Sequence, residues 1–165
     1  MIVGCYNRTM NKITPFLWFD KNLKEITEYY LSIFPDATVE SDGELSDTPS
    51  GDVEMATLTI FGQRLSLMTA GPMFQFTEAI SFMISCENQE EVDYYWNKLT
   101  TNGGSESQCG WCKDKYGLSW QVVPSALGDL MSKSTDAQRK AITQAFLQMK
   151  KFDVAKLEEA FNSVK

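Results

Sequence analysis

Two stretches of this sequence carry the same pattern in the same order. The apolar segment Ile13–Phe19 predicts a strand, and Asn22 with Glu25 forms an N-x-x-E signal typical of a helix start. Another apolar segment precedes the same signal at Asn88 and Glu91. Apolar residues at helical spacing follow both signals. We therefore predict an internal duplication, with repeats at about 13–70 and 79–124.

The segments after the first helix predict three further strands. Ala37–Glu40 predicts a short strand, while the polar, acidic run Ser41–Asp52 predicts a surface loop. Val53–Ile60 and Arg64–Thr69 flank Phe61-Gly62-Gln63 and predict a hairpin. One βαβββ unit cannot bury both faces of its sheet alone, so two units are expected to pair. The predicted fold class is α+β, with two paired βαβββ modules.

The C-terminal residues 125–165 predict a helical extension with no counterpart in the repeats. Ser125–Lys133 favours a short helix, and Thr135 with Gln138 forms a capping box for a second one. Asp153 is expected to cap a last helix. We predict a single domain over residues 12–165, preceded by an extension at residues 1–11.

Charge and cysteine usage narrow the expected partners and location. The net charge of −7 argues against a nucleic-acid surface, and no apolar stretch is long enough to span a membrane. We expect no nucleic-acid or membrane partner. The N-terminal residues lack the apolar core of a signal peptide, and four cysteines are too few for a secreted disulfide scaffold. A cytoplasmic location is expected.

The sequence contains no histidine, the commonest metal ligand and general base. Cys109 and Cys112 form a C-x-x-C motif, for which redox chemistry, zinc binding and plain packing are the alternatives. A redox motif needs its first cysteine at a helix start, and zinc needs a second ligand pair. Cys5 and Cys86 are not paired in sequence. We expect one cysteine of the motif to pack and the other to lie near a turn.

Three segments carry a resemblance to a known family. They are ITPFLWFD, FTEAISFMISCENQEEVDYYWNKL and QCGWCKDKYGLSWQVVP. They resemble the PhnB-like family, often described as 3-demethylubiquinone-9 3-methyltransferase-like, of the vicinal-oxygen-chelate (glyoxalase/bleomycin-resistance) superfamily. The resemblance implies the glyoxalase fold of paired βαβββ modules, a cupped sheet around a small-molecule cavity, and a homodimer.

The metal chemistry of that superfamily is not expected here. By resemblance, Met73 stands where relatives have a histidine, and Gln121 stands where metal-dependent members have a glutamate. A neutral amide is a weak ligand for a hard cation, so we predict no metal and no other cofactor. Methyl transfer is not expected either. The glycine pair Gly103-Gly104 follows a helix instead of forming the turn before one, where a cofactor binds.

Candidate site residues follow from position and residue type. Glu78 leads into a strand and is either a surface carboxylate or a general base at a cavity mouth. The aromatic residues, among them Trp18, Phe74 and Trp111, suit either the core or a cavity wall. By resemblance, Gln121 faces inward. We expect Trp18, Thr69 and Glu78 to join it in a polar cluster of the pocket. We take Glu78 as the catalytic candidate and the other residues as ligand-binding candidates.

The function predicted first is a small-molecule-binding protein or metal-independent enzyme of this superfamily, with an unknown substrate. One alternative is a sequestering protein of the bleomycin-resistance type, which binds without turnover. Another is a metal-dependent lyase or dioxygenase-like enzyme with unrecognised ligands. Whether the chain is an enzyme is left open, because one fold hosts many chemistries.

Overall fold

The structure, a computed structural model, describes residues 12–164. The chain divides into two compact units, the first ending at Phe74 and the second beginning at Gln75. Each unit contains one four-stranded sheet. Each predicted repeat falls within one unit, and the predicted extension at residues 1–11 lies outside the described residues.

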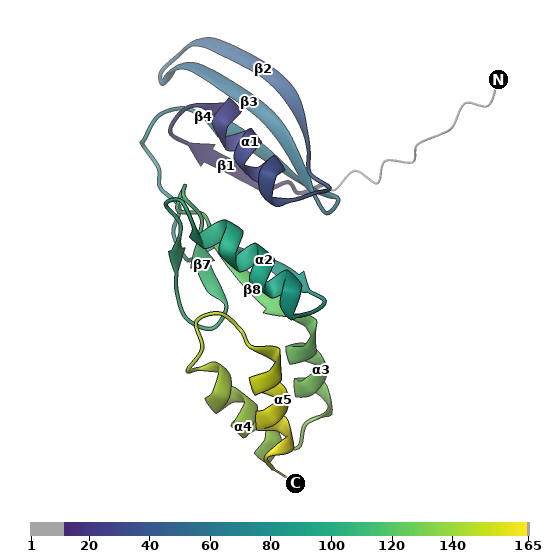
Figure 1. The fold of residues 1–165 in the computed structure, drawn as a ribbon. Helices are drawn as coiled ribbons and strands as arrows, with labels where there is room; N and C mark the ends of the chain where they lie inside the picture. The colour runs from purple at the N-terminus through teal and green to yellow at the C-terminus, as the bar shows by residue number, and fades with distance from the viewer. Residues whose placement is uncertain (1–11, 165) are drawn as a thin grey trace, which may run out of the picture. The chain divides into compact units, whose positions relative to one another are not determined.

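The first unit has the order strand, helix and three strands (Figure 1). These elements are β1 (Phe16–Phe19), α1 (Leu23–Ile33), β2 (Thr38–Thr48), β3 (Gly51–Ile60) and β4 (Gln63–Thr69). The strand order in the sheet is β1-β4-β3-β2. The outermost strand β1 is parallel to β4, while the other neighbours are antiparallel. The helix α1 packs on β3 and β4.

The prediction of a surface loop at Ser41–Asp52 is wrong over much of that segment. Residues 41–48 continue β2 and pair with β3, with register shifts between Ser41 and Gly43 and between Leu45 and Thr48. Nearly every side chain of β2 is exposed. The acidic composition therefore reflects solvent exposure, whereas hydrogen bonds to β3 keep the backbone extended. The hairpin of β3 and β4 is confirmed, with positive φ at Phe61 and Gly62 in its turn.

The second unit repeats the connectivity of the first. Its elements are β5 (Ser81–Cys86), α2 (Gln89–Thr100), β6 (Ser105–Glu106), β7 (Trp111–Lys113) and β8 (Ser119–Pro124). The strand order is β5-β8-β7-β6, again with the first and last strands of the module parallel. The prediction of two βαβββ modules in an α+β fold is confirmed.

Both predicted helix starts are confirmed. The Asn22 side chain accepts a hydrogen bond from the Glu25 backbone N–H at 3.4 Å, and Asn88 accepts one from Glu91 at 3.0 Å. Each bond satisfies a backbone donor that has no partner within its helix. The apolar stripes that follow are buried, with Ile26 and Val92 at corresponding places.

The two faces of the second sheet differ. Trp120 and Val122 of β8 are buried on the face that α2 covers. Because side chains alternate along a strand, Ser119 and Gln121 lie on the other face. We call the face opposite α2 the uncovered face, because α2 does not cover it. It carries the polar side chains Ser119 and Gln121.

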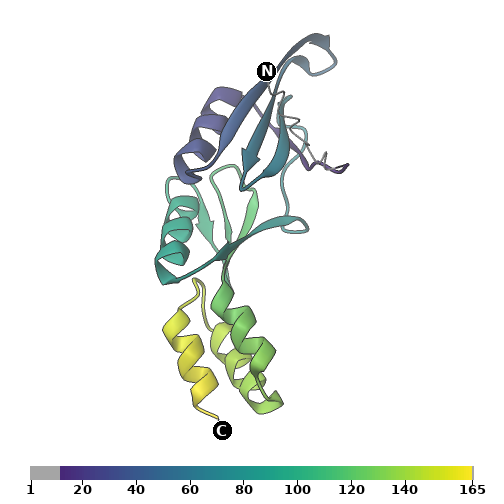
Figure 2. The same ribbon diagram turned by 90° about the vertical axis from the view of Figure 1, so that its right-hand side faces the viewer.

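The C-terminal helices agree with the predicted extension. They are α3 (Ser125–Lys133), α4 (Asp136–Phe146) and α5 (Val154–Asn162), which lie side by side within the second unit (Figure 2). Thr135 and Gln138 form the predicted capping box, and Asp153 caps α5. Among residues 12–164, no helix combines the length and apolar character needed to cross a membrane.

Asp114 fixes the turn between β7 and β8. Its carboxylate is 2% exposed and accepts hydrogen bonds from the backbone N–H groups of Tyr116 and Leu118, at 2.9 and 3.1 Å. The second oxygen accepts from Trp120 Nε1 at 2.9 Å. This one carboxylate therefore joins the turn to the buried face of β8.

Replacing Asp114 should destabilise the second unit. Asp114→Ala leaves three donors without this acceptor, and we expect a loss of about 2–3 kcal/mol in the free energy of unfolding. The exposed Asp129→Ala is the control, and it should change stability by less than about 0.5 kcal/mol. Urea denaturation followed by circular dichroism measures both. Equal stability of the two variants would contradict this role.

Candidate functional site

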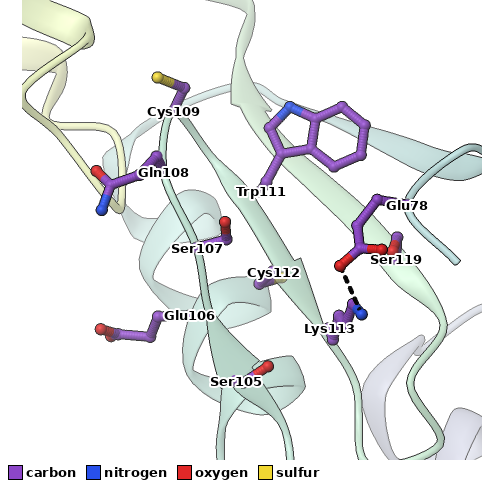
Figure 3. A pocket seen from close by; sticks show the side chains of 10 residues that line it. All are labelled: Glu78, Ser105, Glu106, Ser107, Gln108, Cys109, Trp111, Cys112, Lys113 and Ser119. Carbon is purple, nitrogen blue, oxygen red and sulfur yellow. Dashed lines mark ion pairs between the residues drawn. The ribbon is translucent and has the colours of Figure 1, made fainter.

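A pocket of about 580 Å³ lies in the second unit (Figure 3). It is bounded by the turn before β5, the segment from β6 to β7, and the start of β8. This volume is within the range of small-molecule sites. The lining residues are Glu78, Ser105, Glu106, Ser107, Gln108, Cys109, Trp111, Cys112, Lys113 and Ser119.

The sheet register brings the polar and aromatic groups of the pocket together. Trp111 pairs with Gln121 and Lys113 pairs with Ser119, so all four share the uncovered face of the second sheet. Ser81 of β5 lies beside Ser119 in register, and its hydroxyl accepts a hydrogen bond from the Gln121 amide at 2.9 Å. One aromatic side chain thus lies next to a row of hydrogen-bonding groups.

Glu78 and Lys113 form an ion pair at the pocket, with 2.6 Å between the carboxylate and the amine (Figure 3). The Lys113 amine donates a hydrogen bond to Glu78 and lies beside it as a positive charge, so the pKa of Glu78 falls below its usual value. The Glu78 side chain is 66% exposed. A carboxylate with a lowered pKa is a weak base at neutral pH, which disfavours the general-base role considered for Glu78.

The cysteines of the C-x-x-C motif have different surroundings. Cys112 is buried in β7, and burial raises the pKa of its thiol to about 12. Cys109 lies in the turn before β7 with a φ of 55°, and its thiol contacts the Phe146 carbonyl oxygen. Both thiols are free. As expected, one cysteine packs and the other lies in a turn, while Cys5 lies outside the described residues.

The segment between α4 and α5 holds one wall of the pocket. The backbone N–H groups of Cys109 and Gly110 donate to the carbonyl oxygens of Met149 and Lys150, both at 2.7 Å. Gly110 has a φ of 80°, and its Cα lies against the Phe152 ring. The helical extension therefore fixes the turn that carries Cys109 and leads into Trp111.

Three of the predicted site residues lie together in the second unit. Glu78 and Trp111 line the pocket, and Gln121 lies beside Trp111 in register. Trp18 and Phe74 are in the first unit, where their rings meet edge-on at 5.0 Å. Thr69 is not placed with Trp18: it is buried in the row of Leu65 and Leu67, on the face that α1 covers.

Lys113 and Ser119 line the pocket, although the residue pattern had not singled them out. A period of two from Trp111 places Lys113 on the same face, and a period of two from Gln121 does the same for Ser119. Strand alternation was therefore the signal that identifies them.

The residues present do not fit the metal of the wider superfamily. The Gln121 amide donates its N–H to Ser81, and Glu78 is paired with Lys113. Met73 is exposed in the first unit. Over residues 12–164, no group of three or more His, Cys, Asp or Glu side chains is arranged to hold a metal ion.

Comparison with protein families gives a match to the model described as 3-demethylubiquinone-9 3-methyltransferase, over residues 11–123. The chain belongs to this family. A PhnB protein from Bacillus cereus, itself described as a 3-demethylubiquinone-9 3-methyltransferase, is 30% identical, with a TM-score of 0.60. The match covers 68% of this chain and 98% of that protein. Membership places the chain in the vicinal-oxygen-chelate superfamily.

More distant solved structures share the fold. Protein PA1353 from Pseudomonas aeruginosa is 22% identical with a TM-score of 0.56, over 68% of this chain and 96% of its own. The fosfomycin resistance protein FosX from Listeria monocytogenes is 16% identical with a TM-score of 0.53, over 73% of this chain and 94% of its own. No curated protein matches this chain. The family match ends before α3 begins.

A methyl group at position 110 should disturb the pocket wall. The Cβ of Gly110→Ala would collide with the Phe152 ring and lie 2.8 Å from the Val122 carbonyl oxygen, at a φ that favours glycine. We expect a loss of about 1–3 kcal/mol in stability. The control Gly128→Ala meets nothing within 4 Å and should add about 0.5–1 kcal/mol, because alanine favours helix. Thermal unfolding measures both, and equal shifts would contradict the packing argument.

Removal of Lys113 should raise the pKa of Glu78. The pKa of Glu78 is lowered in the folded chain, so the ion pair stabilises the fold above the unfolded pKa and loses this effect as pH falls through the folded pKa. Lys113→Met should return the Glu78 pKa toward its usual value, as measured by carbon NMR titration of its carboxyl group. Lys151→Met removes a pair with Asp93 outside the pocket and should leave Glu78 unchanged.

Proposed function

We propose that this chain is a small-molecule-binding protein of the vicinal-oxygen-chelate superfamily, and that its ligand occupies the Trp111 pocket without a metal. The observation that carries the proposal is the convergence of Trp111, Lys113 and Ser119 in a pocket of about 580 Å³. An aromatic surface with a few placed polar groups is the usual composition of a small-molecule site.

Two observations favour binding over catalysis. Glu78 is paired with Lys113 of the polar row, and its lowered pKa makes it a poor proton acceptor. Cys112 is buried with a raised thiol pKa, so it is a poor nucleophile. The sequestering type of function, binding without turnover, accords with both.

The side chains available to a metal in this pocket support a function that needs none. Gln121 offers a neutral amide that is already hydrogen-bonded to Ser81, and Lys113 adds a positive charge on the same face. A hard divalent cation prefers carboxylates and is repelled by a nearby amine. The metal-dependent alternative therefore has no suitable donor set in this pocket.

The proposal also includes an internal duplication, a homodimer and a cytoplasmic location. The identical strand orders of the two sheets support the duplication. The resemblance of the sequence to PhnB-like proteins supports the homodimer, which light scattering on the purified protein would test. The free thiols of Cys109 and Cys112 accord with a reducing compartment.

Binding of a neutral aromatic probe tests the proposed pocket. Benzamide added to the ¹⁵N-labelled full chain should give saturable shifts at the amides of Lys113 and Ser119, with and without EDTA. Trp111→Ala should weaken binding by about fivefold to a hundredfold, because stacking on a side chain of this size contributes about 1–3 kcal/mol. The control Tyr94→Ala, on the exposed side of α2, should not change it. Shifts that require a divalent ion, or that are unaffected by Trp111→Ala, would contradict the proposal.

A further inference from the structure

The hydroxyl group of Ser119 is buried without a hydrogen-bond partner. The residue is 0% exposed, it lines the pocket, and its Oγ has no donor or acceptor within reach. A buried hydroxyl in this state destabilises the fold, since it has lost water and gained nothing in exchange. Such a group at a pocket wall is what a hydrogen-bonding ligand atom would satisfy.

Lys113 lies directly opposite Ser119 in the antiparallel pair of β7 and β8. Side chains paired in this way have Cβ atoms about 4.5–5.5 Å apart. The Lys113 amine has three N–H donors, and its ion pair with Glu78 uses one direction of approach. The Lys113 and Ser119 side chains therefore leave the sheet side by side on the face opposite α2.

Glu78 holds Lys113 only weakly. The side chains of the pair are 66% and 33% exposed, for Glu78 and Lys113 respectively, and Glu78 comes from a turn instead of a strand. Exposed ion pairs contribute little to stability, because water screens the charges and both side chains lose freedom. A ligand carboxylate that also reached Ser119 would therefore replace Glu78 as the partner of Lys113.

Glu106, the other acidic residue of the pocket, already has partners of its own. Glu106 accepts hydrogen bonds from Trp96 Nε1 at 3.1 Å and from the Lys150 amine at 3.2 Å. Its charge is thus directed away from the Lys113 and Ser119 row. Because Glu106 is paired with Lys150, Glu78 is the acidic residue of the pocket that competes for Lys113.

We infer that the ligand of this pocket is a small planar carboxylate, bound by Lys113 and Ser119 in place of Glu78, with its flat part against Trp111. One ammonium and one hydroxyl match the two oxygens of one carboxylate, whereas a phosphate dianion would need more donors. In this arrangement, Glu78 acts as a built-in competitor that occupies Lys113 when the ligand is absent. The inference rests on the proposed function, since it concerns the same pocket.

A comparison of benzoate with benzamide tests the effect of ligand charge at nearly constant ligand shape. Both have the same ring, and only benzoate carries a full negative charge. Titration of the ¹⁵N-labelled full chain should show benzoate binding about tenfold more tightly than benzamide, the preference expected of a charge-assisted hydrogen bond. Equal affinities would overturn the inference, while the proposed function would survive.

Four variants test the individual groups. Lys113→Met and Ser119→Ala should each reduce or abolish the preference for benzoate. Ser119→Ala should not destabilise the chain, because it removes a hydroxyl that has no partner. Glu78→Gln should tighten benzoate binding about two- to fivefold, because it removes the competitor. Lys151→Met is the matched control, since Lys151 forms a pair of the same 2.6 Å length with Asp93.

The outcomes distinguish the two proposals. If Glu78→Gln leaves benzoate affinity unchanged or weakens it, Glu78 is not a competitor and the inference fails. If the folded Ser119→Ala variant keeps the full preference for benzoate over benzamide, the hydroxyl does not bind the ligand, and the inference fails. If neither probe shifts the β7 and β8 amides of the folded protein, the proposed function fails as well.

Discussion

Each sheet of this protein depends on hydrogen bonds between the first and last strands of its module, which run in parallel. The helix of each module leads from the first strand to the second, which lies at the far edge of the sheet, and the next two strands bring the chain back beside the first. Such a crossover is needed because parallel strands cannot be joined by a tight turn. That helix covers one face with the apolar stripe that begins after Asn22 or Asn88. The opposite face receives no helix from its module. Strand alternation then divides the residues of β8 between a row that faces the helix and a row that faces away from it, toward the pocket.

The residues that sequence reasoning placed well are those whose positions depend on local chemistry. Asn22, Asn88, Thr135 and Asp153 cap helices because each side chain bonds to a backbone group three residues ahead. Thr69 follows Leu65 and Leu67 at a period of two, and this alternation places it in their buried row. The pairing of Lys113 with Glu78 joins a strand to a distant turn, and no local pattern encodes it.

The pocket combines a family fold with a part of the chain beyond the family match. The strands that carry Lys113 and Ser119 lie within the matched residues, and the turn at Gly110 does as well. The carbonyl groups that hold this turn come from Met149 and Lys150, which lie beyond them. The shape of the wall at Cys109 is therefore a property of this chain, and it does not transfer from relatives that share only the modules.

The exposed strand β2 lies at the edge of the first sheet. Edge strands present backbone groups to which a strand of another molecule can add, the first step toward fibrillar aggregates. β2 carries acidic side chains along its length, at Glu40, Asp42, Glu44 and Asp47, and its register is interrupted twice. An identical edge brought alongside would meet like charges and an irregular backbone. The acidic run thus protects the folded protein from self-association through its longest strand.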